Sequence, residues 1–148
     1  MNATDLVGEL AQRTGLANLA LSGDGTASLV VDGTTTLHIE HDAAAQRLHV
    51  YTPLGVPPAA GREACFGRLL EANLFGLQTG GGSIALHRPS NQLLLTRSMD
   101  LDTTDITALE AALDQMLQAL ASVKALVDAP NGTESAPFDP RLSGLLRG

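Results

Sequence analysis

Three side chains that could bind a metal ion or transfer protons, His38, Glu40 and His49, fall on one face of two adjacent predicted strands. Imidazole nitrogens and carboxylate oxygens are common ligands of transition metals, so this face is a candidate metal site. His41 cannot complete it with His38, because residues three apart on a strand point to opposite faces. The alternative is a solvent-exposed face, on which Glu40 and His49 form a cross-strand pair worth about 0–1 kcal/mol. We favour the exposed face.

The single cysteine, Cys65, is the candidate nucleophile. It lies between Arg62 and Arg68, and nearby cations favour the reactive thiolate form. The local sequence places no His or Asn to form a dyad with it, and its other neighbours are apolar. The pattern therefore favours a buried structural cysteine. One cysteine also excludes an intramolecular disulfide and a thiolate zinc cluster.

A run of three glycines, Gly80–Gly82, invites comparison with phosphate-binding loops. Such loops follow a strand and begin a helix, and they place a Lys or Arg near the phosphate. Here the order is reversed, with a predicted helix before the run and a predicted strand after it, so we expect a flexible connection. The carboxylates of Asp100 and Asp102 precede the last predicted helix, where helix capping explains them. The sequence offers no convincing active site.

The elements that position these residues must come from a chain of 148 residues, which suits one domain. Hydrophobic residues make up 44% and aromatic residues only 3%, so Leu, Val, Ile and Ala must build the core. The net charge of -7 argues against nucleic acid and anionic membrane surfaces as partners. The start lacks the basic and apolar regions of a signal peptide, and no run approaches the roughly 20 apolar residues of a membrane span. We expect a small, acidic, cytoplasmic protein.

Apolar residues at helical spacing predict a first helix over residues 4–14, which Asn2 or Thr4 would cap and Gly15 would end. Alternating apolar and polar residues then predict three strands, around 27–31, 37–41 and 48–52. A turn at Asp32-Gly33 joins the first two strands. Keeping the apolar sets on one face predicts the cross-strand pairs Ile39–Val50, Leu37–Thr52, Glu40–His49 and His38–Tyr51.

A largely apolar segment predicts a second helix over residues 61–75 that is covered on more than one side. The strands of a second hairpin follow over 84–88 and 93–97, and the three leucines Leu93–Leu95 predict a strand buried on both faces. The residues expected to cap the last helix are Asp102, Thr103 or Thr104, with Asp105 in its first turn. Its apolar stripe, which predicts a core face, consists of Ile106, Leu109, Leu113, Met116, Leu120, Val123 and Val127.

The predicted order is helix, three strands, helix, two strands and helix. It predicts an α+β domain in which helices pack against an antiparallel sheet. We expect this domain to span residues 1–129. From Pro130 the composition turns to Asn, Gly, Thr, Ser and Pro, which predicts a flexible C-terminal tail over 130–148.

Several segments form a signature when they are read together. Leu69–Gly76 is followed by Thr79–Gly81 and Ile84–Leu86, while Gly15-Leu16 ends the first helix and Leu48–Gly55 covers the third strand and its turn. Leu93–Leu95 and the final amphipathic helix agree with the same pattern. These segments resemble the class I type III secretion chaperones, the Tir chaperone family. The resemblance covers about residues 3–128 and leaves out the tail.

The resemblance implies a homodimeric, secretion-chaperone-like fold in the bacterial cytoplasm. Its implied partner is the N-terminal region of an unfolded secreted effector, which the chaperone keeps soluble and delivers to the secretion apparatus. The secretion ATPase is a further candidate partner. The resemblance implies neither an enzymatic activity nor a cofactor, and neither nucleic acid nor membrane insertion is expected.

The resemblance also assigns two sets of candidate site residues. The client-binding set lies on the first helix and the first strands, and it comprises Leu6, Val7, Leu10, Leu29, Val31, Leu37 and Ile39. Some of these side chains must face the internal core instead. The dimer-interface set lies on the second helix, which carries more apolar surface than a small sheet can cover, and it comprises Phe66, Gly67, Leu69, Leu70, Asn73 and Leu74. Gly67 would allow the partner to approach closely.

Two functions of other classes stand as alternatives. One is a dimerisation or binding module of the same fold without a secreted client. The other is a small enzyme that uses Cys65 or the face of His38, Glu40 and His49.

Overall fold

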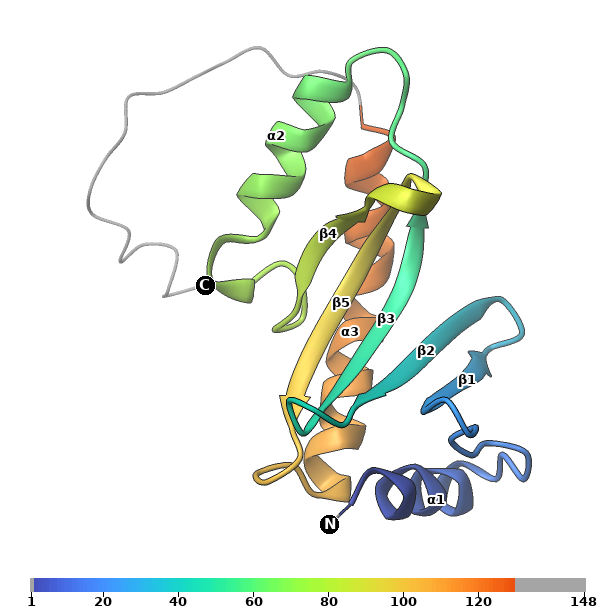
Figure 1. The fold of residues 1–148 in the computed structure, drawn as a ribbon. Coiled ribbons are helices and arrows are strands. Elements are labelled where there is room, and N and C mark those ends of the chain that lie inside the picture. The colour runs from blue at the N-terminus through green and yellow to red at the C-terminus, as the bar shows by residue number, and fades with distance from the viewer. Residues whose placement is uncertain (1, 130–148) are drawn as a thin grey trace.

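The structure is a computed structural model that describes residues 2–129, so the predicted tail at 130–148 lies outside the described residues. Its elements follow the predicted order (Figure 1). They are α1 (Ala3–Thr14), β1 (Thr26–Val31), β2 (Thr35–Asp42), β3 (Arg47–Gly55), α2 (Arg62–Ala72), β4 (Ser83–His87), β5 (Gln92–Asp100) and α3 (Ile106–Val127). Short 3-10 helices cover Leu74–Gly76 and Arg88–Ser90.

The strands form one antiparallel sheet of five strands in the order β1-β2-β3-β5-β4, so β1 and β4 are its two edges. This confirms the predicted α+β class. The long helix α3 runs along one face of the sheet, α1 lies at the end near β1 and β2, and α2 stands beside β4 (Figure 1). The core lies between the sheet and these helices. None of the helices in the described range is long and apolar enough to cross a membrane.

The first helix begins and ends where the sequence predicts. The Asn2 side chain caps it by accepting a hydrogen bond of 2.8 Å from the backbone N–H of Asp5. Gly15 ends it with φ of 71°, a left-handed conformation that glycine adopts without steric cost. The buried face of α1 therefore carries Leu6, Val7 and Leu10 toward the sheet and α3.

The predicted register between β2 and β3 is confirmed. Ile39 lies opposite Val50, and the neighbouring pairs Glu40–His49 and His38–Tyr51 follow from the same alignment. The turn between β1 and β2 contains Asp32 and Gly33, both with positive φ. The register is set because a slip of one residue would move the whole apolar set to the other face.

The second helix is shorter than the predicted span of 61–75, because it ends at Ala72. Phe75 and Gly76 both have positive φ, which an α-helix cannot continue. Asn73 also fastens the end of α2 to the sheet, since its amide donates to the Ile84 carbonyl at 3.1 Å and accepts from the Ile84 N–H at 2.7 Å.

The last helix has the predicted core face but a different cap. All seven residues of the apolar stripe are buried, which confirms the periodicity. The N-cap is Asp105, whose carboxylate accepts a hydrogen bond of 2.8 Å from the N–H of Ala108. Asp102, Thr103 and Thr104 were therefore wrong as caps. Thr104 instead donates its hydroxyl to the Asp100 carbonyl at 2.7 Å, which closes the turn after β5.

The leucine run in β5 is buried on one face only. Leu93 and Leu95 point into the core, whereas Leu94 on the opposite face is partly exposed. It lines a shallow hollow of about 500 Å³ with Tyr51, Pro53 and other residues of that face. The prediction of a strand buried on both faces was wrong, because the described chain places its helices against one face.

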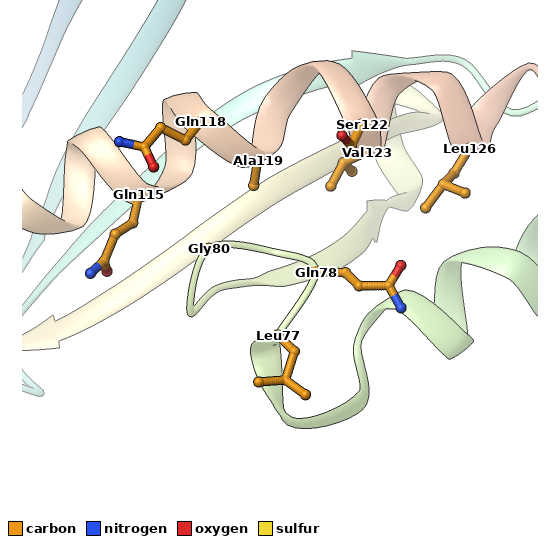
Figure 2. A pocket seen from close by; sticks show the side chains of 9 residues that line it. All are labelled: Leu77, Gln78, Gly80, Gln115, Gln118, Ala119, Ser122, Val123 and Leu126. Carbon is orange, nitrogen blue, oxygen red and sulfur yellow. The ribbon is translucent and has the colours of Figure 1, made fainter. Parts of the chain in front are cut away.

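The glycine run is a tightly packed turn, which corrects the prediction of a flexible connection. Thr79 is buried, and its hydroxyl donates to the Gly82 carbonyl at 2.6 Å. A Cβ atom on Gly80 would lie 2.3 Å from the Gln115 carbonyl of α3, and one on Gly82 would lie 2.4 Å from the Thr96 carbonyl of β5. Figure 2 shows Gly80 passing beside α3 near Gln115. The backbones approach too closely for any side chain.

We therefore expect Gly80→Ala to destabilise the fold. The added methyl group would collide with backbone and would strain a residue with φ of 62°, so the free energy of unfolding should fall by about 2–4 kcal/mol. Gly8→Ala is the matched control, because Gly8 lies inside α1 with open space around it and should gain about 0.5–1 kcal/mol. Urea unfolding measures both. An unchanged midpoint for Gly80→Ala would contradict the close packing of this turn.

Candidate functional site

A groove lies between the end of α1, the first two strands and α3. Its volume is about 240 Å³, and we call it the α1–α3 groove. The apolar residues that line it are Leu10, Leu29, Val31, Leu37, Leu113 and Leu117. The polar residues at its mouth are Arg13, Thr14, Glu110 and Asp114. A cavity of about 150 Å³ accepts a benzene-sized group, so this groove can hold a large apolar side chain.

The structure divides the predicted client-binding set into two groups. Leu10, Leu29, Val31 and Leu37 line the α1–α3 groove. Leu6, Val7 and Ile39 are completely buried and support the groove from the core. Of these four lining residues, Val31 is the least buried, whereas Leu10 is only 1% exposed.

Sequence reasoning missed the contribution of α3 to this groove. Leu113 was assigned only to the core stripe, and Leu117 was not assigned at all. Leu117 is partly exposed and lies off the stripe, one turn after Leu113. An apolar residue outside the core face of a helix is the signal that could have identified it.

The groove lies beside an open edge of the sheet. Among residues 2–129, β1 pairs only with β2, so within this range its other side presents backbone N–H and C=O groups without strand partners. Val31 at the end of β1 lines the groove, and Val30 beside it is 54% exposed on the opposite face. An extended segment that pairs with β1 would therefore pass next to the apolar groove.

The charged groups at the mouth link α1 to α3. Arg13 Nη1 donates to Glu110 Oε1 at 3.1 Å, and Arg13 Nε lies 3.6 Å from Glu9 Oε1. These side chains are partly exposed, so each pair adds about 1 kcal/mol or less. Asp114 lies one turn further along α3 and is exposed.

A second apolar surface lies on α2 and the edge strand β4, and we call it the α2–β4 surface. It forms a hollow of about 250 Å³ lined by Phe66, Leu69, Leu70, Asn73, Ile84, Ala85, Leu86 and Leu93. Leu70 is 71% exposed there, and the turn after α2 adds the exposed side chains of Leu74 and Phe75. Exposed apolar side chains gathered in this way are typical of a protein interface.

The predicted dimer-interface residues all belong to this region. Phe66, Leu69, Leu70 and Asn73 line the hollow, although Leu69 is 4% exposed and belongs mainly to the core. Gly67 is exposed, and a Cβ atom there would meet nothing within 4 Å. The space beside Gly67 is thus open to another molecule.

The residues that could do chemistry have structural partners. Cys65 is fully buried, and its thiol donates to the Val127 carbonyl at 3.5 Å, which confirms a structural cysteine that joins α2 to the end of α3.

A third hollow, of about 520 Å³, lies between the glycine turn and α3 (Figure 2). It is lined by the amides Gln78, Gln115 and Gln118 together with Ser122 and apolar side chains. These groups offer hydrogen bonds but no nucleophile paired with a base.

The histidines of the sheet face bind neighbouring hydroxyl groups. His38 Nδ1 hydrogen-bonds with Ser28 Oγ at 2.9 Å, and the His38 ring stacks on Tyr51. His49 Nδ1 hydrogen-bonds with Ser98 Oγ at 2.7 Å, and its Nε2 lies 3.4 Å from a carboxylate oxygen of Asp42 rather than of Glu40.

The Glu40 carboxylate affects the pKa of Tyr51. Burial, together with the nearby Glu40 carboxylate, raises the pKa of Tyr51 to about 12. Within residues 2–129, no group of three or more His, Cys, Asp or Glu side chains is arranged to hold a metal ion.

The sequence as a whole matches a known family. Residues 5–124 fit the sequence model of the Tir chaperone protein (CesT) family. The chain belongs to the Tir chaperone family. The matched span runs from the first turn of α1 into the last turns of α3, so it contains both the α1–α3 groove and the α2–β4 surface. The resemblance inferred from the sequence motifs is confirmed.

Solved structures share the fold of this Tir-family chain. A chain of the ExsC–ExsE complex has a TM-score of 0.69 and 21% identity, with 86% of this chain and 97% of that chain covered. A chain of the HopA1–SchA chaperone–effector complex has a TM-score of 0.68 and 19% identity, with 81% of this chain and 91% of that chain covered. A third structure is the Yersinia pestis complex of the type III secretion chaperone SycH with a fragment of YscM2. One of its chains has a TM-score of 0.63 and 20% identity, with 81% of this chain and 98% of that chain covered. The search of curated proteins found no match.

Proposed function

We propose that this protein is a type III secretion chaperone of the bacterial cytoplasm. It binds the N-terminal region of a secreted effector, keeps it soluble and hands it to the secretion apparatus. The observation that carries the proposal is an apolar groove beside an unpaired sheet edge in a member of the Tir chaperone family. Solved structures of the same fold come from complexes of chaperones with effectors or other proteins. The proposed role is binding, and none of its steps requires catalysis.

The physical basis is the complementarity between this site and an unfolded chain. An unfolded segment exposes apolar side chains and unpaired backbone groups, and both are available partners for β1 and the α1–α3 groove. Addition of the segment to β1 would pair its backbone, while alternate side chains would point toward the groove. Ordering the segment costs conformational entropy, so the apolar contacts must outweigh this cost.

We also propose that the protein is a homodimer through the α2–β4 surface. Three apolar side chains remain exposed in the single chain: Leu70, Leu74 and Phe75. A two-fold interface would bury the copy of each one on both protomers. The dimer would place one α1–α3 groove on each protomer, near the sheet edge opposite β4. The net charge of -7 helps to keep such a protein soluble despite its apolar surfaces.

Affinity purification from the cytoplasm of the source bacterium tests the proposed function. We expect the wild-type protein to recover one abundant secreted protein, identified by mass spectrometry, and deletion of the N-terminal region of that client to abolish recovery. A dimerisation module without a client would recover no secreted protein. Recovery that is unchanged when the N-terminal region of the client is deleted would contradict the proposed binding mode.

A further inference from the structure

The mouth of the α1–α3 groove carries more negative than positive charge. Among the described residues, Arg13 is the one cation that lines the groove, and its guanidinium is shared between the carboxylates of Glu110 and Glu9 at 3.1 and 3.6 Å. Asp114 adds a third carboxylate, and none of the ion pairs found among residues 2–129 involves it. The charge of Asp114 is therefore available to a ligand in the groove.

The carboxylate of Asp114 lies next to an apolar floor. Asp114 follows Leu113 and precedes Leu117 by three residues on α3, and all three line the groove. Lysine and arginine side chains suit this arrangement, because they can lay an apolar stem along the leucines and keep the charged end in water at the mouth. An acidic side chain in the same place would face the carboxylates of Asp114 and Glu110 and would be repelled.

We propose that the α1–α3 groove selects client segments in which a lysine or arginine lies two positions from an apolar anchor residue. This inference rests on the proposed function and names the chemistry of the client. Side chains two apart in an extended segment point to the same side and are about 7 Å apart. The anchor can then rest on Leu117 while the basic side chain reaches Asp114. Arg13 keeps its contact with Glu9 when Glu110 turns toward the client.

The charge of the whole protein acts in the same direction. A net charge of -7 attracts basic segments over a distance that salt shortens to about 10 Å at 0.1 M. Association of a basic segment should therefore slow as salt increases, and an uncharged segment should show little change. The contact with Asp114 is local, so a substitution there separates it from the general attraction.

Synthetic peptides test the inference directly. Three peptides of roughly ten residues, enough to pair along the six residues of β1, would alternate Val and Thr around one Leu anchor and differ only in Lys, Gln or Glu two positions away. We expect the Lys peptide to bind the wild-type protein about threefold to fivefold more tightly than the Gln peptide, and the Glu peptide to bind more weakly than either. In Asp114→Asn the preference for Lys over Gln should fall to less than about twofold. Fluorescence anisotropy measures each affinity.

Two controls separate this inference from the proposed function. Glu71→Gln removes the same charge from an exposed position on α2 and should keep the full preference for Lys. Leu117→Lys places a charge in the floor and should weaken all three peptides. Equal binding of the Lys and Gln peptides, with both weakened by Leu117→Lys, would overturn the charge preference and leave the groove as the binding site. Failure of every peptide to bind at about 1 mM would overturn the groove itself.

Discussion

Leu70→Asp should convert the dimer to a folded monomer. Leu70 is 71% exposed in the single chain, so an aspartate there faces water and should leave the free energy of unfolding of the monomer nearly unchanged. In the proposed dimer the same side chain is buried on both protomers. Loss of two leucine side chains removes about 3–6 kcal/mol of apolar burial per dimer, and two buried carboxylates add a further penalty. Light scattering at micromolar concentration should give about twice the chain mass for the wild type and the mass of one chain for the variant.

Two other substitutions make this prediction specific. Val30→Asp replaces an apolar residue of similar exposure on β1, at the opposite edge of the sheet from β4, and should leave the dimer intact. Leu69→Asp buries a charge in the core, because Leu69 is only 4% exposed, and should unfold the chain rather than separate two folded chains. A dimer that survives Leu70→Asp would show that another surface joins the protomers.

Local rules predicted the strands and the ends of α1 correctly. The pairing of Ile39 with Val50 follows from alternation together with the short turn between the two strands, since a slip of one residue would move one apolar set out of the core. The caps at Asn2 and Gly15 are equally local, because they depend on backbone groups within one turn of the helix. Such features need no knowledge of distant residues.

Features that depend on distant segments were not predictable in the same way. The glycine turn is closely packed because the backbones of Gln115 and Thr96 lie against it, and neither residue is near it in the sequence. The groove needs Leu113 and Leu117 of α3 as well as the first helix and strands. The exposure of Leu70 beside the burial of Leu69 likewise depends on where α2 lies relative to α3 and β4.

The structure therefore changes the choice of residue for separating client binding from dimerisation. Leu10 belongs to the client-binding set predicted from the sequence, so Leu10→Asp is the first substitution to consider. Leu10 lines the groove but is only 1% exposed, so a charge there would be buried in the folded protein and should destabilise it by several kcal/mol. Leu117 lines the same groove, is partly exposed and comes from the outer part of α3. It is the better position for a test.

Leu117→Glu and Leu117→Lys should both abolish tight client binding while the protein stays folded and dimeric. Each removes an apolar contact worth about 1.5–3 kcal/mol and places a charge where an apolar client side chain should lie, so affinity for the N-terminal segment of the effector should fall about 100-fold or more. The two signs of charge matter, because a purely electrostatic site would be weakened by one and strengthened by the other. Gln118→Lys, at the next position on α3 and outside the groove lining, is the matched control and should bind nearly as well as the wild type. Isothermal titration gives the affinities, and light scattering and thermal melts show whether each variant is dimeric and folded. Full affinity in either Leu117 variant would exclude the α1–α3 groove as the site of the client's apolar anchor.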